Sequence, residues 1–275
     1  MWDKTANLRA YDNIEKMSNY NSPEELKKYR EHLLKKSRAQ ADLISSYFTE
    51  KAKLKVFEAC SGNSRMLYQL HLDGILEEGI GVEISNSRAK FAEEWKKEFN
   101  GINVTNICGD IIKYESKTDY YDLIICITGA LGYFYPIDTN YPEILIKKFN
   151  EMLKYKGYLL LELYQHANGV NFCMMDEKKE FNTWVELPES DPFRYYLMKY
   201  TYHEDEGCLD SKEIFIRRDG YIDDSKNEVL KIYSLDEISQ LLGNNGFKIK
   251  NIFSEWDKKK YNESDEKLII MAEKI

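Results

Sequence analysis

A single glycine and two acidic residues stand where three predicted strands end, in the first half of the chain. Gly62 lies in the turn "EACSGNS" between an apolar segment and a helix, and Glu83 ends the next apolar segment 21 residues later. An acidic side chain at about that separation binds the ribose hydroxyls of nucleotides in open α/β sheets. Asp110 ends the third segment, "NICGD", where its carboxylate can accept a hydrogen bond from the exocyclic amine of a base. The three positions indicate a site for an adenosine-containing ligand. Three isoleucines beside them are placed to sandwich an adenine ring: Ile84, Ile111 and Ile112.

The elements that must position these residues alternate between strand and helix from about residue 53 to residue 164. Near-continuous apolar segments such as "DLIICI" and "YLLLEL" are typical of strands that are buried on both faces. Strands that alternate with helices at this spacing predict right-handed βαβ units and a parallel sheet covered on both faces. Ligands bind such a sheet outside the carboxyl ends of its strands, which is where Gly62, Glu83 and Asp110 stand.

The two ends of the chain and the stretch after the fifth strand show other patterns. Residues 23–49 have the periodicity of an amphipathic helix, and residues 165–230 show short alternating segments that predict antiparallel strands. After residue 230, a capped helix and two strands joined by about ten polar residues predict an antiparallel pair at the edge of the sheet. The expected organisation is a helical lid over 1–50, a cofactor-binding core over 51–165 and 230–275, and an inserted substrate-binding cap over 166–229.

Composition and charge limit the class of partner. The net charge is −8 over 275 residues, with Asp and Glu spread along the chain, which argues against nucleic acid. No apolar segment reaches the roughly 20 residues of a membrane span, and the start "MWDKTANLRAYDN" does not have the pattern of a signal peptide. We therefore expect a cytoplasmic monomer or homodimer with a small-molecule substrate and no nucleic-acid or membrane partner. No metal site is expected, because the four histidines show no ligand-type spacing: His32, His71, His166 and His203.

In its motifs the chain resembles the class I S-adenosylmethionine-dependent methyltransferases of small molecules. The family's first motif, an acidic residue followed by alternating glycines, stands here as "EACSGNSRML", with Cys60 and Ser64 in place of two glycines. The later motifs are matched by "GVEIS" at 81–85, "GDI" at 109–111, "YDLIICITGALGYF" at 121–134 and "MLKYKGYLLLEL" at 152–163. The resemblance implies an α/β fold with a Rossmann-like seven-stranded sheet whose last strand is reversed. To this fold the insertion adds an antiparallel β cap, and residues 1–50 add an N-terminal helical lid.

The resemblance also implies S-adenosylmethionine as the cofactor and gives the motif residues their roles. Glu58 and the backbone around Ala59 and Gly62 hold the amino-acid end, and Arg65 completes that motif. Glu83 takes the ribose hydroxyls, while the adenine and the sulfonium fall to the residues of the later motifs: Ile84, Asp110 and Ile111 for the base, and Thr128 for the sulfonium. Two tyrosines ahead of the N-terminal helix are candidate lid residues over the cofactor, with aromatic packing as the alternative: Tyr11 and Tyr20.

The substrate side of the site is expected to include four residues: Tyr133, Tyr164, Trp184 and Arg194. The segment "CITGALGYF" lacks the Asn-Pro-Pro-Tyr-like box of many enzymes that modify nucleic-acid bases or protein amides. That favours methyl transfer to an oxygen or nitrogen of a free metabolite, sugar or natural-product intermediate.

His166 and His203 are candidate general bases. His166 shares a strand face with Glu162 and Tyr164 if the fifth strand continues that far, and a loop histidine bonded to backbone is the alternative. Two other functions stay open. A non-catalytic cofactor-binding protein fits the same fold, whereas a nicotinamide-dependent oxidoreductase needs the G-x-G-x-x-G pattern that "EACSGNS" lacks.

Overall fold

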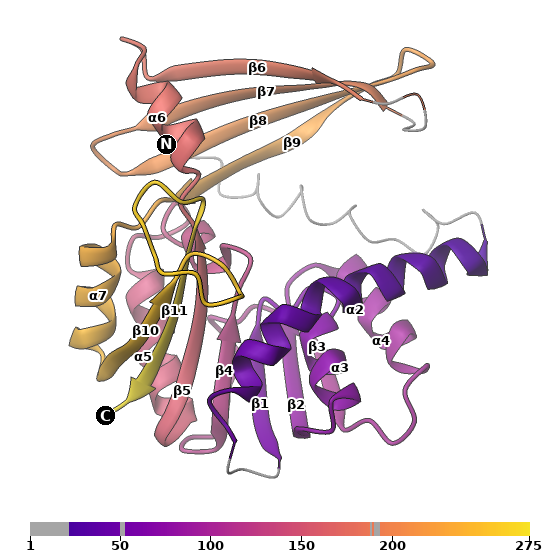
Figure 1. The fold of residues 1–275 in the computed structure, drawn as a ribbon, viewed down its shortest axis with the longest axis vertical. Helices are drawn as coiled ribbons and strands as arrows, with labels where there is room; N and C mark the ends of the chain where they lie inside the picture. The colour runs from indigo at the N-terminus through magenta and orange to yellow at the C-terminus, as the bar shows by residue number, and fades with distance from the viewer. Residues whose placement is uncertain (1–21, 50–52, 188, 190–192) are drawn as a thin grey trace.

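The computed structural model describes residues 22–49, 53–187, 189 and 193–275. A seven-stranded sheet forms its centre, with the order β10-β11-β5-β4-β1-β2-β3 (Figure 1). Its strands are β1 (Leu54–Ala59), β2 (Leu76–Glu83), β3 (Val104–Cys108), β4 (Tyr121–Cys126), β5 (Leu153–Tyr164), β10 (Phe247–Phe253) and β11 (Lys267–Lys274). Strands β1 to β5 are parallel, and β11 runs antiparallel to both β5 and β10. The predicted seven-stranded sheet with a reversed last strand is confirmed.

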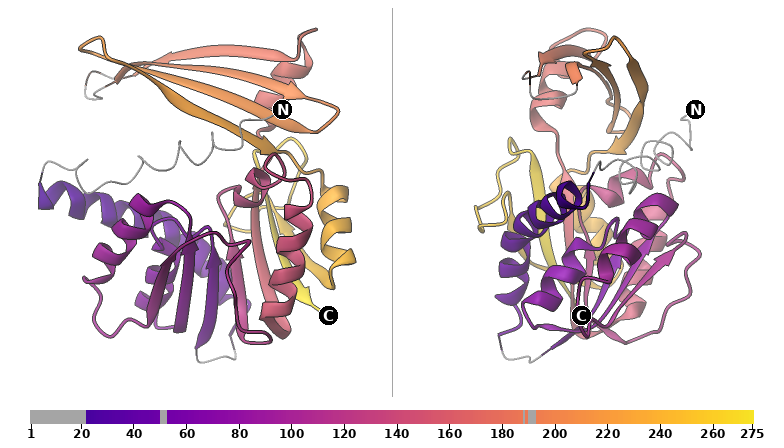
Figure 2. Two further views of the ribbon diagram at one scale, coloured as in Figure 1. Left: turned by 180° about the vertical axis from the view of Figure 1, so that it is seen from behind. Right: turned by 90° about the vertical axis from the view of Figure 1, so that its right-hand side faces the viewer.

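Helices cover both faces of this sheet, as the two views of Figure 2 show. They are α2 (Pro23–Ser45), α3 (Arg65–Leu72) and α4 (Asn86–Lys96) on one face, and α5 (Tyr141–Met152) and α7 (Leu235–Asn244) on the other. The strands supply buried side chains to both layers, because successive residues point to opposite faces. In β4, Leu123 and Ile125 belong to one core and Ile124 to the other. Among the described residues, no helix is long and apolar enough to cross a membrane.

Helix α2 begins where its sequence predicts. Ser22 is the N-cap, its Oγ accepts a hydrogen bond from the Glu25 amide (3.2 Å), and Pro23 opens the first turn. The apolar face of the helix, including Leu43 and Ile44, is buried against the sheet and α3. Tyr11 and Tyr20 lie outside the described residues, so their predicted part in a lid stays a prediction.

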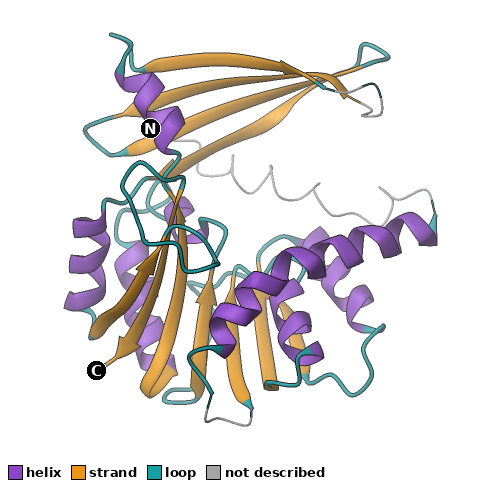
Figure 3. Cartoon of the chain, in the orientation of Figure 1, coloured by secondary structure: helices purple, strands orange, loops and turns teal. Residues whose placement is uncertain are grey.

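A second sheet, antiparallel and four-stranded, is inserted between β5 and α7. It consists of β6 (Glu180–Glu186), β7 (Phe193–His203), β8 (Cys208–Arg217) and β9 (Ile222–Lys231). This sheet, which we call the cap, lies above the edge of the central sheet where the loops after β1, β2 and β4 emerge (Figures 1 and 3). The predicted antiparallel insertion is confirmed.

A short helix that the sequence did not predict, α6 (Ala167–Met174), connects β5 to the cap. Strand β5 ends at Tyr164, and His166 is the N-cap of α6 with a φ of 44°. His166 would share a strand face with Glu162 and Tyr164 only if β5 continued to residue 166. This condition is not met, because the strand ends at Tyr164.

Candidate functional site

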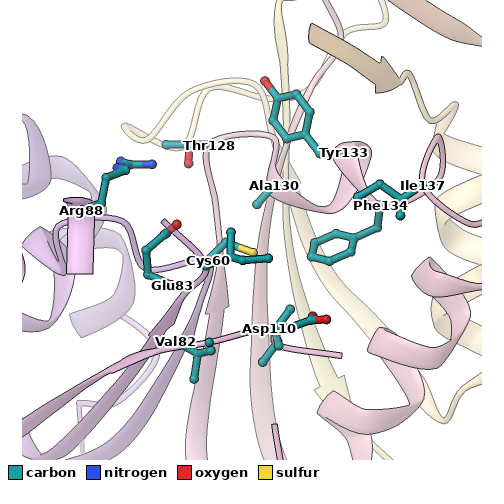
Figure 4. A pocket seen from close by; sticks show the side chains of 13 residues that line it. Cys60, Val82, Glu83, Arg88, Asp110, Thr128, Ala130, Tyr133, Phe134 and Ile137 are labelled. Atoms are coloured by element: carbon teal, nitrogen blue, oxygen red, sulfur yellow. The ribbon is translucent and has the colours of Figure 1, made fainter. Parts of the chain in front are cut away.

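A pocket opens at the carboxyl ends of β1, β2, β3 and β4, and Figure 4 shows the side chains around it. Its lining residues are Cys60, Val82, Glu83, Ile84, Arg88, Gly109, Asp110, Ile111, Thr128, Ala130, Tyr133, Phe134 and Ile137. The polar groups are few and the rest of the wall is apolar, as in most small-molecule sites. Five of the residues predicted for the cofactor are among them: Glu83, Ile84, Asp110, Ile111 and Thr128.

Glu83 is buried at the end of β2, and its carboxylate is held by two backbone amides. The Gly62 N–H donates to Oε2 (2.7 Å) and the Ser85 N–H donates to Oε1 (2.8 Å). Each carboxylate oxygen has a second lone pair, so both can also accept from the two hydroxyls of a ribose. Gly62 has a φ of 55°, in the left-handed region that favours glycine. The sequence thus predicted the position of Glu83, and the structure adds that this side chain also shapes the glycine turn.

Arg88, one turn into α4, is a pocket residue that the sequence analysis missed. Its guanidinium lies over Gly62, where a Cβ atom would collide with Nη2. In Figure 4 it stands on the same side of the pocket as Glu83. The one signal in the sequence is its place five residues after Glu83, which cannot reveal that the side chain folds back over the first turn.

Glu58 lies inside β1, below the pocket rather than on its wall. The side chain is buried, and Oε2 has no hydrogen-bond partner among the described residues. Burial raises the pKa of Glu58 to about 8, and the positive charges of Arg65 and Arg88 oppose this rise. A buried carboxyl group of this kind suits an additional donor, such as the ammonium of an amino acid.

Asp110 and Ile111 lie in the loop after β3, at the end of the pocket that the resemblance gives to the adenine. The Ile112 N–H donates to Asp110 Oδ1 (2.9 Å), so Asp110 caps its own turn, and its Oδ2 lies 3.8 Å from Lys113 Nζ. Lys148 holds the loop from α5, because its Nζ donates to the carbonyl oxygens of Ile111 (2.9 Å) and Ile112 (3.1 Å). Ile84 is about half exposed across the pocket from this loop.

Thr128 marks the opposite end of the pocket, after β4. Its φ is 59°, and its N–H donates to Oε2 of the buried Glu162 (2.8 Å). The next residue, Gly129, lies directly under the ring of Tyr164: a Cβ there would be 2.6 Å from Tyr164 Cδ2. Tyr164 therefore stands beside the end of the pocket that the resemblance gives to the sulfonium.

Arg65 points away from the pocket. Its Nη1 donates to Ser37 Oγ (2.6 Å) and to Gln40 Oε1, both on α2. Arg65 thus joins α2 to α3, and neither Arg65 nor Ala59 is on the wall of the pocket.

Tyr133 connects the pocket to the cap. Its ring lines the pocket, and its hydroxyl donates to Glu228 Oε2 on β9 (3.0 Å). Gly132 allows β9 to come close, because a Cβ there would lie 2.7 Å from Leu230 Cδ1 and 2.8 Å from the Lys231 carbonyl oxygen.

The structure does not bring the other two predicted substrate residues to this pocket. Trp184 is 63 % exposed on β6, and its register partner Leu197 lies on the sheet face opposite that of Tyr200. Arg194 pairs with Glu186 (3.5 Å) near the far end of the same strands.

The two histidines differ in position. His166 lies at the start of α6 with its ring centroid 5.5 Å from that of Tyr164, and burial lowers its pKa. His203 ends β7 and is not among the residues that line the pocket.

The fold and the pocket together define a class, which comparison with known structures supports. The methyltransferase CcbJ from Streptomyces caelestis superposes with a TM-score of 0.74 at 16 % identity, over 86 % of this chain and 89 % of that one. An S-adenosylmethionine-dependent methyltransferase from Clostridium acetobutylicum ATCC 824 gives 0.68 at 16 % identity, over 86 % and 91 % of the two chains. The amino pentose methyltransferase CalS10 from Micromonospora echinaspora, solved with bound S-adenosylmethionine, gives 0.64 at 12 % identity, over 93 % and 98 %. The class is that of the class I S-adenosylmethionine-dependent methyltransferases, and S-adenosylmethionine is the cofactor.

A family profile for a methyltransferase domain matches residues 50–232. The chain belongs to this family. No curated protein matches the sequence.

Proposed function

We propose that this protein transfers the methyl group of S-adenosylmethionine to an oxygen or nitrogen atom of a small molecule held between the strand ends and the cap. The observation that carries the proposal is the course of the pocket. It begins at Asp110, passes Glu83, and reaches Thr128 and Tyr133, where the cap is bonded to its wall through Glu228.

The residues present fit the cofactor, which supplies a methyl group activated by a positively charged sulfur. Glu83 would bind the ribose hydroxyls, and Asp110 with the amide of Ile111 would bind the adenine edge. Glu58 and the Gly62 turn would hold the amino-acid end, and Thr128 would lie beside the sulfur. The buried Oε2 of Glu58 and the remaining lone pairs of Glu83 support this assignment.

The contribution of the chain to such a reaction is mainly to hold and orient the acceptor. Bringing two reactants into line can supply most of the acceleration in a displacement with a good leaving group. Tyr133 and Tyr164 supply apolar surface at the reactive end, and the cap lies above the central sheet on this side (Figure 1).

His166 is the group best placed to accept a proton from the acceptor. Burial lowers its pKa, so the imidazole is neutral at pH 7 and can act as a base. It lies against the ring of Tyr164, which in turn lies on Gly129 at the reactive end. His203, which does not line the pocket, is the second candidate.

A small acceptor is consistent with the chemistry of the cap and with the descriptions of two structural neighbours. One structural neighbour is described as an amino pentose methyltransferase and another as a glycopeptide N-methyltransferase, MtfA, at 12 % and 15 % identity. We propose that this protein likewise acts on a small metabolite or natural-product intermediate, as a cytoplasmic enzyme.

The test is transfer of radiolabelled methyl from S-adenosylmethionine to a small-molecule extract of cells that make the protein. We expect labelled product that requires the parent protein and that falls by about 10- to 150-fold with Glu83→Ala at a subsaturating cofactor concentration. Tight binding of the cofactor with no labelled product would instead support a non-catalytic cofactor-binding protein.

A further inference from the structure

We propose that the methyl acceptor is an amine, which binds in its ammonium form against carboxylates on the face of the cap that meets the core. This proposal rests on the methyl transfer proposed above and names the acceptor class of the same site.

The face in question, here called the inner face, is identified by the register of the cap. Tyr200 is aligned with Phe181 on β6 and Ser211 on β8, and Ser211 with Glu228 on β9. Residues directly opposite one another in a sheet share a face. Tyr200 packs in one cluster with Tyr133 and Tyr164 of the core, and Glu228 accepts the hydrogen bond of Tyr133. The inner face therefore borders the reactive end of the pocket.

Carboxylates gather on and around the inner face. Two residues further along the strands, on the same face, Met198 is aligned with Glu213, which is only 8 % exposed. A third carboxylate, Glu266, accepts from the amide of Asn168 on α6 (3.1 Å).

The same carboxylates act on two tyrosines of the inner face. Burial is the largest cause of the raised pKa of Tyr200, and the charges of Glu213, Glu266 and Glu228 raise it further. The pKa of Tyr196 is raised by burial and by its hydrogen bond and charge interaction with Glu213.

A negative field lined by aromatic rings is the environment that binds an organic cation. Ammonium groups are attracted both to carboxylates and to the faces of tyrosine rings. Among the described residues, no three His, Cys, Asp or Glu side chains are grouped to hold a metal ion. The same field would disfavour a phosphorylated or carboxylated acceptor, because like charges repel.

An ammonium must lose a proton before it can accept a methyl group, and His166, near the same carboxylates, can take that proton. Glu266 and Glu213 both act on His166, whose ring lies against Tyr164. The ammonium gives one proton to the imidazole, and the freed lone pair of the amine forms the new N–C bond. The C–S bond of the cofactor breaks at the same time, and its electron pair stays on sulfur. His166 then returns its proton to water.

The experiment measures the charge of the labelled product. Radiolabelled S-adenosylmethionine is incubated with the parent protein and a small-molecule extract of cells that make it, and the product is passed over a cation exchanger at pH 7. We expect the label on a retained, cationic product, stable to mild base. Labelled product that is neutral, anionic or released as methanol by base would overturn the amine assignment while leaving methyl transfer intact. The absence of any labelled product would count against the proposed function itself.

Charge-removing variants test the recognising residues. Glu213→Gln and Glu228→Gln are each expected to lower kcat/KM for the extracted acceptor by about 10-fold or more, with the Kd of S-adenosylmethionine unchanged. The matched control is Glu180→Gln on β6, since Glu180 is the register partner of Thr201 and bonds Lys199 on the opposite face of the cap (2.8 Å). Parent-like kcat/KM in both inner-face variants, with melting temperatures and cofactor binding intact, would contradict the proposal.

Discussion

At the residue scale, we expect Asp110 to serve both the fold and the ligand. One carboxylate oxygen caps the turn by accepting from Ile112, so Asp110→Asn retains this acceptor and the turn should survive. The substituted amide places a donor against the adenine amine. We expect the affinity for S-adenosylmethionine to fall by about 10-fold. The affinity for its inosine analogue, which has a carbonyl acceptor in place of the adenine amine, should fall less. Calorimetry with both ligands measures the difference, and equal losses would show that Asp110 does not contact the base edge.

Glu58 makes the stability of the apo protein depend on pH. Its folded pKa of about 8 lies above the ordinary value of 4.5, so the folded state favours the neutral acid. This group's contribution to stability is complete below pH 4.5 and is lost as pH rises through 8. Between pH 4.5 and pH 8, the free energy of unfolding should therefore fall less in Glu58→Gln than in the parent protein. Denaturant unfolding at a series of pH values tests this, and parallel curves for the two proteins would contradict it.

Arg65 connects two helices through its hydrogen bonds, and we infer from these contacts a structural role rather than a direct contact with the cofactor. Arg65→Ala leaves the buried oxygens of Ser37 and Gln40 without this donor, which should destabilise the protein by about 1–3 kcal/mol. The Kd of S-adenosylmethionine should change little. Arg38→Ala is the control, because Arg38 is an exposed residue of α2 paired with Asp73 and should cost less than about 1 kcal/mol. Intact stability with lost cofactor binding would restore the role that the motif implied.

At the level of elements, the contact between the 3-10 helix Ala130–Tyr133 and β9 sets the position of the cap. Gly132→Ala puts a methyl group against Leu230 and the Lys231 backbone, and the overlap should cost about 1–3 kcal/mol. Gly169→Ala in α6 is the control, since nothing lies within 4 Å of its Cβ position and alanine favours a helix. Thermal unfolding of the two variants should give shifts of opposite sign. A Gly132→Ala protein as stable as the parent would mean that β9 can shift at this contact without a cost in stability.

The sequence predicted the central elements well because their signals are local. Apolar segments such as those of β4 and β5 are buried on both faces. Helix α2 begins at the predicted residue 23, and α7 is capped, as predicted for the helix after residue 230. Helix α6 was missed because eight residues with one glycine give little periodicity. Alternation in the cap strands predicts two faces but not which face meets the core, and so Trp184 was assigned to the substrate side.

The candidate site shows the same division. The positions of Glu83 and Asp110 could be predicted because they stand at strand ends, which meet at one edge of a parallel sheet, whereas Thr128 was predicted from the family resemblance. Arg88 could not be predicted, because its contact with Gly62 depends on how α4 packs beside the first turn.

On the scale of the whole molecule, we expect the chain to divide cofactor binding and substrate binding between its two sheets. The pocket residues proposed to bind the cofactor all lie in the central α/β part, and the cap contacts the pocket wall through Tyr133. Replacing residues 166–229 by a short linker should abolish methyl transfer and leave cofactor binding measurable, provided that circular dichroism shows a folded protein. Loss of cofactor binding in a folded truncation would mean that the cap helps to build the cofactor site.

The central claim is that S-adenosylmethionine binds across the strand ends with its ribose on Glu83. Isothermal titration of the cofactor into the parent protein and Glu83→Ala tests it most directly. We expect micromolar binding by the parent and a loss of about 1.5–3 kcal/mol in the variant, since a charged acceptor of two hydroxyls is removed. A folded Glu83→Ala protein that binds S-adenosylmethionine as tightly as the parent would contradict the account.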